Sequence, residues 1–254
     1  MIVFTLLKLK KYGMINKKIC EAIALKNVKK IVIKLSGESL ANGDVGINFD
    51  KALDIAADLK KIYESGLRLL LVIGGGNFWR GRTNQYMDSD TSDYVGMLGT
   101  EMNALVLGDA LKQIGCPVKV FLRYSVPCAN SYEADALKKA IDENIIIVGG
   151  GIGKPQHSTD SGAAAAAKDI EADLLIKMSK TEGIYDSDPF TNPNAKKIDC
   201  LTFNEAIEMQ LGIMDLEAFE ICKEANVSII VSKMDNLLDI IDIANGNSTG
   251  STIK

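Results

Sequence analysis

The chain has 254 residues, of which 47% are hydrophobic and 24% are charged, proportions typical of a globular protein with a substantial core. The formal net charge of −4 argues against nucleic acid as the main partner, since binding to a duplex requires a basic surface. Five scattered cysteines and a single histidine argue against a disulfide framework or a structural zinc site and indicate a reducing, cytoplasmic environment.

The first 27 residues read as a basic N-terminal extension, to which we assign no function. Its apolar start is followed rather than preceded by lysines and has no small-residue cleavage site, so it lacks the order of a signal peptide. Translation from Met14 is an alternative start. No apolar run in the chain approaches the roughly 20 residues of a membrane span.

From residue 28 onward, short apolar runs alternate with segments of helical periodicity. Strands are expected at residues 28–34, 69–73, 118–122, 145–148, 174–178 and 227–231. Helices are expected at residues 49–64, 93–114, 131–144, 159–170, 215–225 and 237–244. Asp93 is expected to cap the second helix, and a capping box at Thr202-x-x-Glu205 opens a further short one. The alternation predicts an α/β fold, a three-layer α/β/α sandwich with a mostly parallel open sheet.

Three of the expected strands run directly into polar loops that contain glycine. Glycine lets backbone N–H groups approach a bound anion closely, and ligands of open α/β sheets bind at the carboxyl ends of the strands. One such loop is consistent with a tight turn, whereas three together indicate a phosphate site. The three junctions read Ile31-Val-Ile-Lys-Leu-Ser-Gly37, Leu69-Leu-Leu-Val-Ile-Gly-Gly-Gly76 and Ile145-Ile-Ile-Val-Gly-Gly-Gly-Ile-Gly153.

Two familiar phosphate-binding motifs are approached but not completed. The dinucleotide fingerprint G-x-G-x-x-G lacks its last glycine at both Trp79 and Gln156. The Walker A pattern lacks a glycine at Val148 and its hydroxyl residue at Pro155. These differences argue against a Rossmann dehydrogenase and against a P-loop kinase.

The remaining candidate groups are cations and backbone donors. Lys34 and Lys180 stand at strand ends and Arg80 follows the triple glycine, whereas His157 reads as a surface loop residue and offers no nucleophile-and-base pair. This set suits phosphoryl transfer, in which catalysis is mostly positioning and charge stabilisation. A phosphate acceptor, whose second pKa is about 6, is largely deprotonated at neutral pH and needs no general base.

Several sequence blocks keep a fixed order and compatible spacing from about residue 28 to residue 254. They read Lys34-Leu-Ser-Gly-Glu-Ser, Val72-Ile-Gly-Gly-Gly-Asn-x-x-Arg-Gly81, Asp93-Tyr-Val-Gly-Met-Leu-Gly-Thr-x-Met-Asn103, Ser158-Thr-Asp160, Glu182-Gly-Ile-Tyr-Asp-Ser-Asp-Pro189 and Met214-Asp-Leu-x-Ala218. Together they resemble the bacterial UMP kinases, a branch of the amino acid kinase superfamily. The resemblance implies an acceptor-binding lobe at about residues 28–165 and an ATP-binding lobe at about residues 166–254.

The resemblance implies transfer of the γ-phosphoryl group of ATP to UMP, giving UDP and ADP in pyrimidine nucleotide biosynthesis. Its catalytic residues would be Lys34, Arg80 and Asp160, with Asp160 orienting Lys34. Asp93 would accept hydrogen bonds from the ribose of UMP, and the loop at 152–159 would recognise uracil. The implied ATP-binding residues are Lys34, Leu35, Ser36, Gly37, Gly76, Arg80, Ser179, Tyr185 and Asp188. The implied UMP-binding residues are Gly75, Asp93, Ile152, Gly153, Lys154, Pro155, Gln156, His157, Ser158 and Thr159.

The resemblance also implies cofactors and an assembly. ATP would carry Mg²⁺ on its phosphates, with no protein site for the metal. The family is typically a homohexamer that GTP activates and UTP inhibits, and residues 42–47 stand near its effector loop. No nucleic-acid or membrane partner is implied.

The base-recognition loop departs from the family pattern. Family members usually have Thr-Gly-Asn-Pro, two aromatic residues and Thr-Thr-Asp, where this chain has Ile152-Gly-Lys-Pro-Gln-His-Ser-Thr-Asp160. The choice between UMP and CMP therefore stays open. One alternative is a relative that phosphorylates a carboxylate or carbamate, such as an acetylglutamate, glutamate, aspartate or carbamate kinase; Asp93 and Met214-Asp-Leu argue against it. A second alternative is a non-catalytic nucleotide-binding or oxyanion-storage protein on the same fold; the presence of Lys34, Arg80 and Asp160 argues against it.

Overall fold

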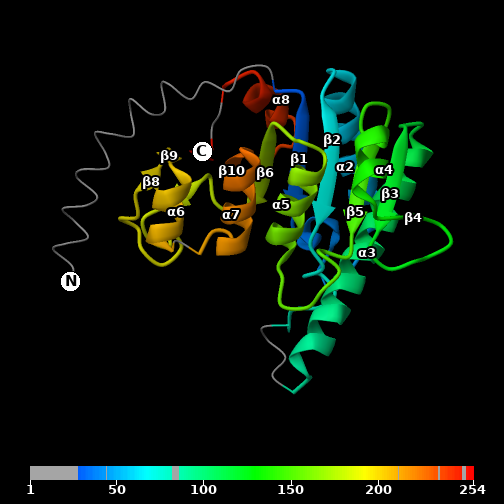
Figure 1. The fold of residues 1–254 in the computed structure, drawn as a ribbon, viewed down its shortest axis with the longest axis horizontal. Coiled ribbons are helices and arrows are strands. Elements are labelled where there is room, and N and C mark those ends of the chain that lie inside the picture. Colours follow the sequence, from blue (N-terminus) through cyan, green and yellow to red (C-terminus); the bar gives the residue numbers. More distant parts are fainter. Residues whose placement is uncertain (1–27, 44, 82–85, 211, 234, 248–249) are drawn as a thin grey trace.

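A nine-stranded sheet runs through the middle of the molecule in the order β4-β3-β5-β2-β1-β6-β10-β11-β9 (Figure 1). The structure is a computed structural model that describes residues 28–43, 45–81, 86–210, 212–233, 235–247 and 250–254, so the expected extension at 1–27 lies outside the described residues. Every pairing in this sheet is parallel except that of β10 with β11. The strands are β1 (Lys30–Leu35), β2 (Arg68–Ile73), β3 (Val118–Leu122), β4 (Asn130–Ser131), β5 (Ile145–Gly149), β6 (Leu174–Ser179), β9 (Cys200–Leu201), β10 (Ser228–Lys233) and β11 (Ser251–Ile253).

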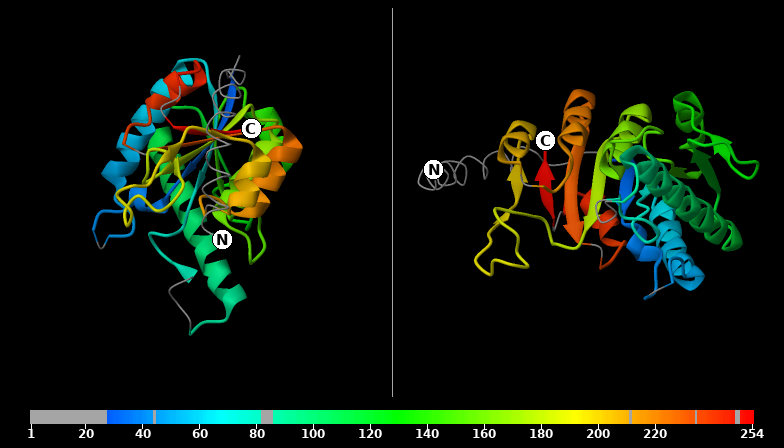
Figure 2. Two further views of the ribbon diagram at one scale, coloured as in Figure 1. Left: turned by 90° about the vertical axis from the view of Figure 1, so that its left-hand side faces the viewer. Right: turned by 90° about the horizontal axis from the view of Figure 1, so that it is seen from below.

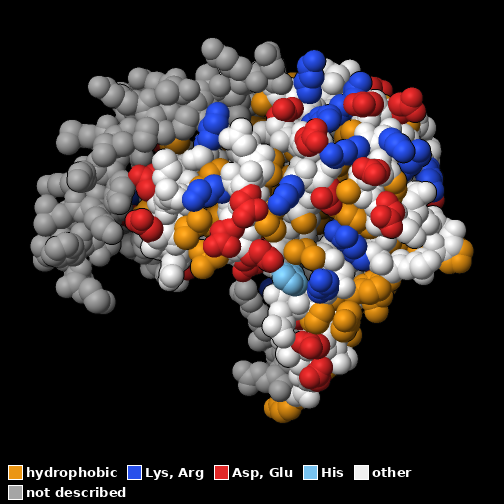
Figure 3. Space-filling view, viewed as in Figure 1, with side chains coloured by type: hydrophobic (Ala, Val, Ile, Leu, Met, Phe, Trp, Pro, Cys, Tyr) orange, Lys and Arg blue, Asp and Glu red, His pale blue; other side chains and the backbone are white. Residues whose placement is uncertain are grey.

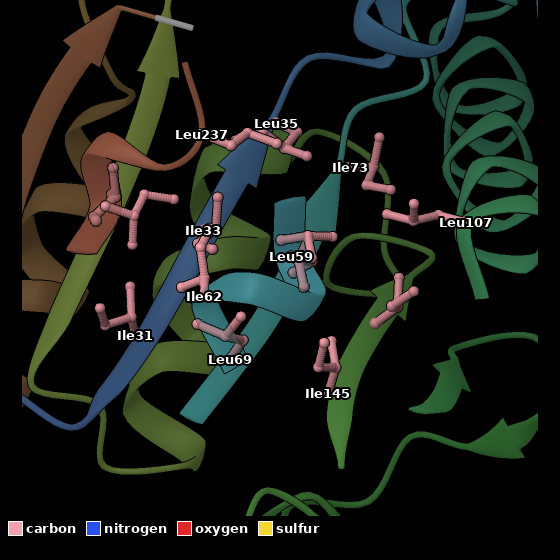
Figure 4. Packing of buried hydrophobic residues seen from close by; sticks show 14 of the residues in the cluster. Ile31, Ile33, Leu35, Leu59, Ile62, Leu69, Ile73, Leu107, Ile145 and Leu237 are labelled. Atoms are coloured by element: carbon pink, nitrogen blue, oxygen red, sulfur yellow. The ribbon is translucent and has the colours of Figure 1, made fainter. Parts of the chain in front are cut away.

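The central strands are buried on both faces because apolar residues occupy successive positions along them. In β1, the odd-numbered positions from Ile31 to Leu35 face one core and Val32 faces the other. Figure 4 shows the first core, in which β1 packs against Leu59 and Ile62 of α2 (Phe49–Glu64). Burying one such side chain stabilises the fold by roughly 1.5–3 kcal/mol. The same alternation places Lys34 on the face opposite α2.

Helices cover both faces of the sheet, which confirms the expected three-layer α/β/α sandwich (Figure 2). The first face carries α2, α3 (Ser89–Gln113) and α8 (Asp239–Ala244). The second face carries α4 (Ala134–Ala140), α5 (Thr159–Asp169), α6 (Phe203–Met209) and α7 (Leu216–Ala225). Within the residues that the structure describes, no helix is both long enough and apolar enough to cross a membrane.

The structure corrects the start of α3, which the sequence placed at Asp93. The helix begins at Ser89, because the side chain of Asp88 caps it by accepting a hydrogen bond from Thr91 N–H at 3.0 Å. Asp93 therefore lies inside the helix, where its carboxylate is available for other partners. The N-terminal part of α3 projects away from the sheet (Figure 1).

Several short elements were not expected from the sequence. They are β4, β9 and β11, together with an antiparallel pair formed by β7 (Ile184–Tyr185) and β8 (Lys197–Ile198). Strands of two or three residues are too short to show an alternating pattern. Because Asn130–Ser131 pair with β3, α4 begins at Ala134 rather than at residue 131.

Candidate functional site

The predicted glycine loops meet at the carboxyl edge of the central strands. The parallel register places Lys34 of β1 beside Val72 of β2 on one side and beside Lys177 of β6 on the other. The turn that contains Gly74 to Gly76 follows β2 directly, and η1 (Gly37–Leu40) follows β1. The arrangement gathers cations and glycine backbone at one edge, as the sequence predicted.

A pair of asparagines that the sequence reasoning did not single out ties the turn after β2 to α3, and the loop after β1 packs against this pair. The amide of Asn103 donates to Gly74 O at 2.7 Å and exchanges hydrogen bonds of 2.8 and 2.9 Å with Asn77. Gly37 lies directly against them, since a Cβ there would stand 2.2 Å from both Asn77 Oδ1 and Gly74 O. The close approach of these backbones therefore requires glycine at position 37.

The triple-glycine turn also packs tightly against α3. A Cβ on Gly75 would lie 2.4 Å from Gly96 O, so this position too requires glycine. The carbonyl of Gly75 accepts hydrogen bonds from the N–H groups of Phe78 and Trp79, each at 3.0 Å. The indole N–H of Trp79 donates to Ser92 Oγ at 2.8 Å. Trp79 thus fixes the turn to the helix.

Asp160, in the first turn of α5, pairs with two lysines. Lys34 Nζ lies 3.1 Å from Asp160 Oδ1 and Lys177 Nζ lies 2.5 Å from Asp160 Oδ2. Ser158 caps the helix by accepting from the N–H groups of Asp160 and Ser161. Burial opposes ionisation of Asp160, but the two ammonium groups outweigh it and hold its pKa below the ordinary value. The geometry brings the predicted pair of Lys34 and Asp160 together and adds Lys177, which the sequence reasoning missed.

Glu38 joins the other two predicted cations. Its carboxylate pairs with the guanidinium of Arg80 and lies 2.9 Å from Lys180 Nζ. Arg80 Nε also donates to Gly76 O at 3.3 Å. All three side chains are partly exposed at the mouth of the site. The carboxylate of Glu38 therefore pairs with Arg80 and Lys180, the two side chains that we expect to contact the substrate phosphates.

A cavity of about 270 Å³ opens beside the triple-glycine turn. Among the predicted UMP-binding residues, it is lined by Gly75, Asp93, His157, Ser158 and Thr159, whereas positions 152–156 do not line it. Further lining comes from Gly76, Trp79, Gly81, Ser92, Gly96, Met97, Thr100 and Gly151. The cavity is thus built from the glycine turn, α3 and the segment that enters α5.

The predicted base-recognition loop is held over this cavity by side chains from neighbouring elements. Gln156, with a left-handed φ of 67°, donates its N–H to Asp93 Oδ2 at 2.7 Å. His157 Nδ1 lies 2.8 Å from Glu217 Oε2 at the start of α7, and its side chain is 30% exposed. Partial burial raises the pKa of Glu217, but its interactions with His157 and Ser161 together outweigh that effect, and the net direction is downward. His157 is therefore a paired residue of the site and not simply a surface loop residue.

The residues predicted for the adenosine side lie at the end of β6 and in the segment that leads from it to β9. None of Ser179, Tyr185 and Asp188 lines the cavity beside the glycine turn. Asp188 Oδ1 accepts a hydrogen bond from Phe190 N–H at 2.9 Å, as turn-forming aspartates do. Within the described part of the chain, no group of three or more His, Cys, Asp or Glu side chains is arranged to hold a metal ion.

The fold is that of a known class of kinase. The model of the amino acid kinase family matches residues 29–233, and the chain belongs to that family. It is similar to the crystal structure of UMP kinase from Ureaplasma parvum, with 33% identity, a TM-score of 0.82 and coverage of 89% of this chain and 99% of that one. It is also similar to UMP kinase from Bacillus anthracis, with 28% identity, a TM-score of 0.84 and coverage of 90% and 97%. Uridylate kinase from Archaeoglobus fulgidus, at 22% identity, shares the fold, with a TM-score of 0.67 and coverage of 89% and 100%.

Proposed function

We propose that this chain is a UMP kinase that transfers the γ-phosphoryl group of ATP directly to UMP, giving UDP and ADP. The observation that carries the proposal is the ion pair of Lys34 with Asp160 at 3.1 Å, next to a cavity lined by Gly75 and Asp93. Membership of the amino acid kinase family and similarity to two UMP kinases support the same activity.

In the proposed mechanism, positioning and charge account for catalysis. Lys34 stabilises negative charge on the transferred phosphoryl group, and Asp160, already paired, orients that lysine and does not serve as a base. Arg80 leaves Glu38 to contact phosphate, for which its planar guanidinium is well suited. Gly75 and Gly76 bring backbone close to the phosphates, and the phosphate of UMP attacks in line as an already ionised nucleophile.

Specific contacts would position the two nucleotides. Asp93 accepts hydrogen bonds from the ribose of UMP, and the loop at 152–159 closes on uracil. ATP lies over the backbone of residues 34–37, with its adenosine towards Ser179, Tyr185 and Asp188. Mg²⁺ carried by the nucleotide phosphates would supply neutralisation of their negative charge. Residues 28–165 form the acceptor lobe and residues 166–254 the ATP lobe.

We further propose that the protein is a cytoplasmic homohexamer, activated by GTP and inhibited by UTP, with residues 42–47 near the effector. For the assembly, the supporting feature is an apolar stripe on α3, where Tyr94, Leu98 and Met102 are 43%, 49% and 44% exposed at successive turns. Figure 3 shows hydrophobic side chains where α3 leaves the body of the molecule. For the effectors, the support is the resemblance of the sequence to the bacterial UMP kinases.

The proposal is tested by ADP release from Mg·ATP with UMP, CMP and acetylglutamate offered separately. Turnover with UMP alone is the expected result. Turnover with both UMP and CMP would support phosphoryl transfer to a pyrimidine nucleotide and show that the altered 152–159 loop accepts both bases. Turnover with acetylglutamate alone, or ATP binding without turnover on any acceptor, would overturn the proposal.

A further inference from the structure

Two lysines stand side by side on the sheet at the proposed transfer site. Lys34 of β1 and Lys177 of β6 are direct neighbours in the parallel register. Val32 and Leu175, two positions earlier on each strand, belong to the core beneath α5. Because side chains two positions apart on a strand share a face, both lysines point towards α5. Asp160, at the start of that helix, lies between them.

The cluster is enclosed and carries more positive than negative charge. The side chains of Lys34, Lys177 and Asp160 are only 16%, 14% and 11% exposed. Burying a lysine in a strand that is otherwise apolar is costly, and a single ion pair with Asp160 would need only one of the two. Two ammonium groups share one carboxylate, so one positive charge remains uncompensated within the cluster.

Lys177 has a second, different anchor. Its ammonium group donates to the carbonyl of Ile213, in the segment that leads into α7. This segment includes Met214, which is buried, and Asp215, the N-cap residue of α7. Lys177 therefore ties Asp160 of α5 to the Met214-Asp-Leu block, whose role the mechanism above leaves unassigned.

We propose that Lys177 is a positioning residue for phosphoryl transfer. Lys177 shares Asp160 with Lys34 and anchors Asp160 to the 212–215 segment. It thereby holds the ammonium group of Lys34 towards the transferred phosphate and leaves the positive charge of Lys34 only partly neutralised. Without Lys177, Asp160 would be free to pair fully with Lys34, and the charge offered to the transferred group would fall. This inference rests on the proposed kinase function, although it does not depend on which acceptor is used.

The test compares Lys177→Met, which keeps the length of the side chain but removes its charge, with Lys177→Arg, which keeps the charge. Lys30→Met is the matched control, since Lys30 Nζ also donates to a backbone carbonyl, that of Ile170 at 3.3 Å, but at the opposite end of β1. Rates are expressed per ATP-binding site, counted by calorimetry, so that loss of folded protein does not count as loss of catalysis.

The expected result is a kcat about 10- to 100-fold lower in Lys177→Met, with KM for ATP and for UMP changed less than about 3-fold, because only charge and aim at the transferred group are altered. Lys177→Arg should recover most of the lost rate, and Lys30→Met should match the wild type. Asp160→Asn/Lys177→Met should be no slower than Asp160→Asn by more than about 2-fold, since both changes act through one group.

A wild-type kcat in Lys177→Met, or multiplicative losses in the double variant, would overturn the inference. If Lys177→Met does not fold, a Lys177→Arg enzyme that binds ATP but is no faster than Lys34→Met would overturn it as well. The wild-type enzyme separates the two proposals: no turnover with UMP refutes the proposed acceptor, whereas the Lys177 inference depends on the ratio of variant to wild type with whichever acceptor is turned over.

Discussion

Replacing Asp160 by asparagine removes the carboxylate that pairs with both Lys34 and Lys177, at distances of 3.1 and 2.5 Å, without changing the size of the side chain. Because all three side chains are largely buried, two lysines are left without their counterion. Breaking a buried ion pair in this way costs about 3–5 kcal/mol. For a chain of this size, that cost corresponds to a fall in Tm of about 6–20 °C.

The loss should depend on pH in a defined direction. In the wild type, burial lowers the pKa of Lys177 below its ordinary value and Asp160 partly opposes that effect, so the pKa should fall further in Asp160→Asn. Between the folded-state pKa and the ordinary value of 10.5, the unfolded chain binds more protons, and the free energy of unfolding rises with pH. The stability gap between variant and wild type should therefore narrow as the pH rises towards 10.5.

On the acid side the gap should narrow too. The folded-state pKa of Asp160 lies below the ordinary value of 3.8, so its stabilising contribution is present above pH 3.8 and is lost as the pH falls through the folded-state pKa. Calorimetric Tm values of the wild type and of Asp160→Asn, taken across the pH range, measure the narrowing of the gap on the acid side and on the alkaline side. Asp58→Asn, which alters a more exposed pair with Lys61, is the control and should cost less than about 1 kcal/mol. A stability gap that stays constant with pH, or a Tm of Asp160→Asn equal to that of the wild type, would show that the charge of Asp160 does not stabilise the fold through Lys34 and Lys177.

Four further substitutions test individual contacts. Lys34→Ala should lower kcat for ADP release at least ~10²-fold, because it removes charge from the transition state, and a near-normal kcat would refute that role. Asp93→Ala should chiefly raise KM for UMP; an unchanged KM would show that the ribose of UMP does not bind at Asp93. Gly37→Ala should lower both Tm and affinity for ATP, since its Cβ would stand 2.2 Å from two neighbouring oxygens, and wild-type values would contradict the tight packing. Glu38→Gln should strengthen ATP binding in calorimetry by releasing Arg80 and Lys180, and equal or weaker binding would show that Glu38 does not compete with phosphate.

The sequence was sufficient to predict the six longer strands of the sheet and the glycine loops at their carboxyl ends, since both follow from local patterns. Buried strands show as continuous apolar runs, and the loops after them show as glycine next to Lys34 or Arg80. The expected bounds of α2 were confirmed because its periodicity, the Asn48 cap and the Gly66 that follows all agree. The predicted start of α3 was wrong because Asp88 and Asp93 are both plausible caps. Only the hydrogen bond that Thr91 N–H donates to Asp88 distinguishes them.

Contacts between distant elements could not be predicted in the same way. Lys177 meets Asp160 only because β6 lies next to β1, a strand order that no local pattern specifies. One signal was present, a lysine inside the apolar run of β6, which would have indicated a buried partner. The pairing of Glu38 with Arg80 and Lys180 likewise joins segments that are distant in the sequence, as does the hydrogen bond from Gln156 to Asp93.

The most direct test of phosphoryl transfer from ATP to UMP is to follow the label from [γ-³²P]ATP when Mg²⁺ and UMP are both supplied to the wild-type enzyme. Direct transfer predicts that the label appears in UDP at the same rate as ADP is formed, and that Lys34→Ala lowers both rates at least ~10²-fold. Label that appears only in inorganic phosphate, or on the enzyme itself, would contradict direct transfer from ATP to UMP.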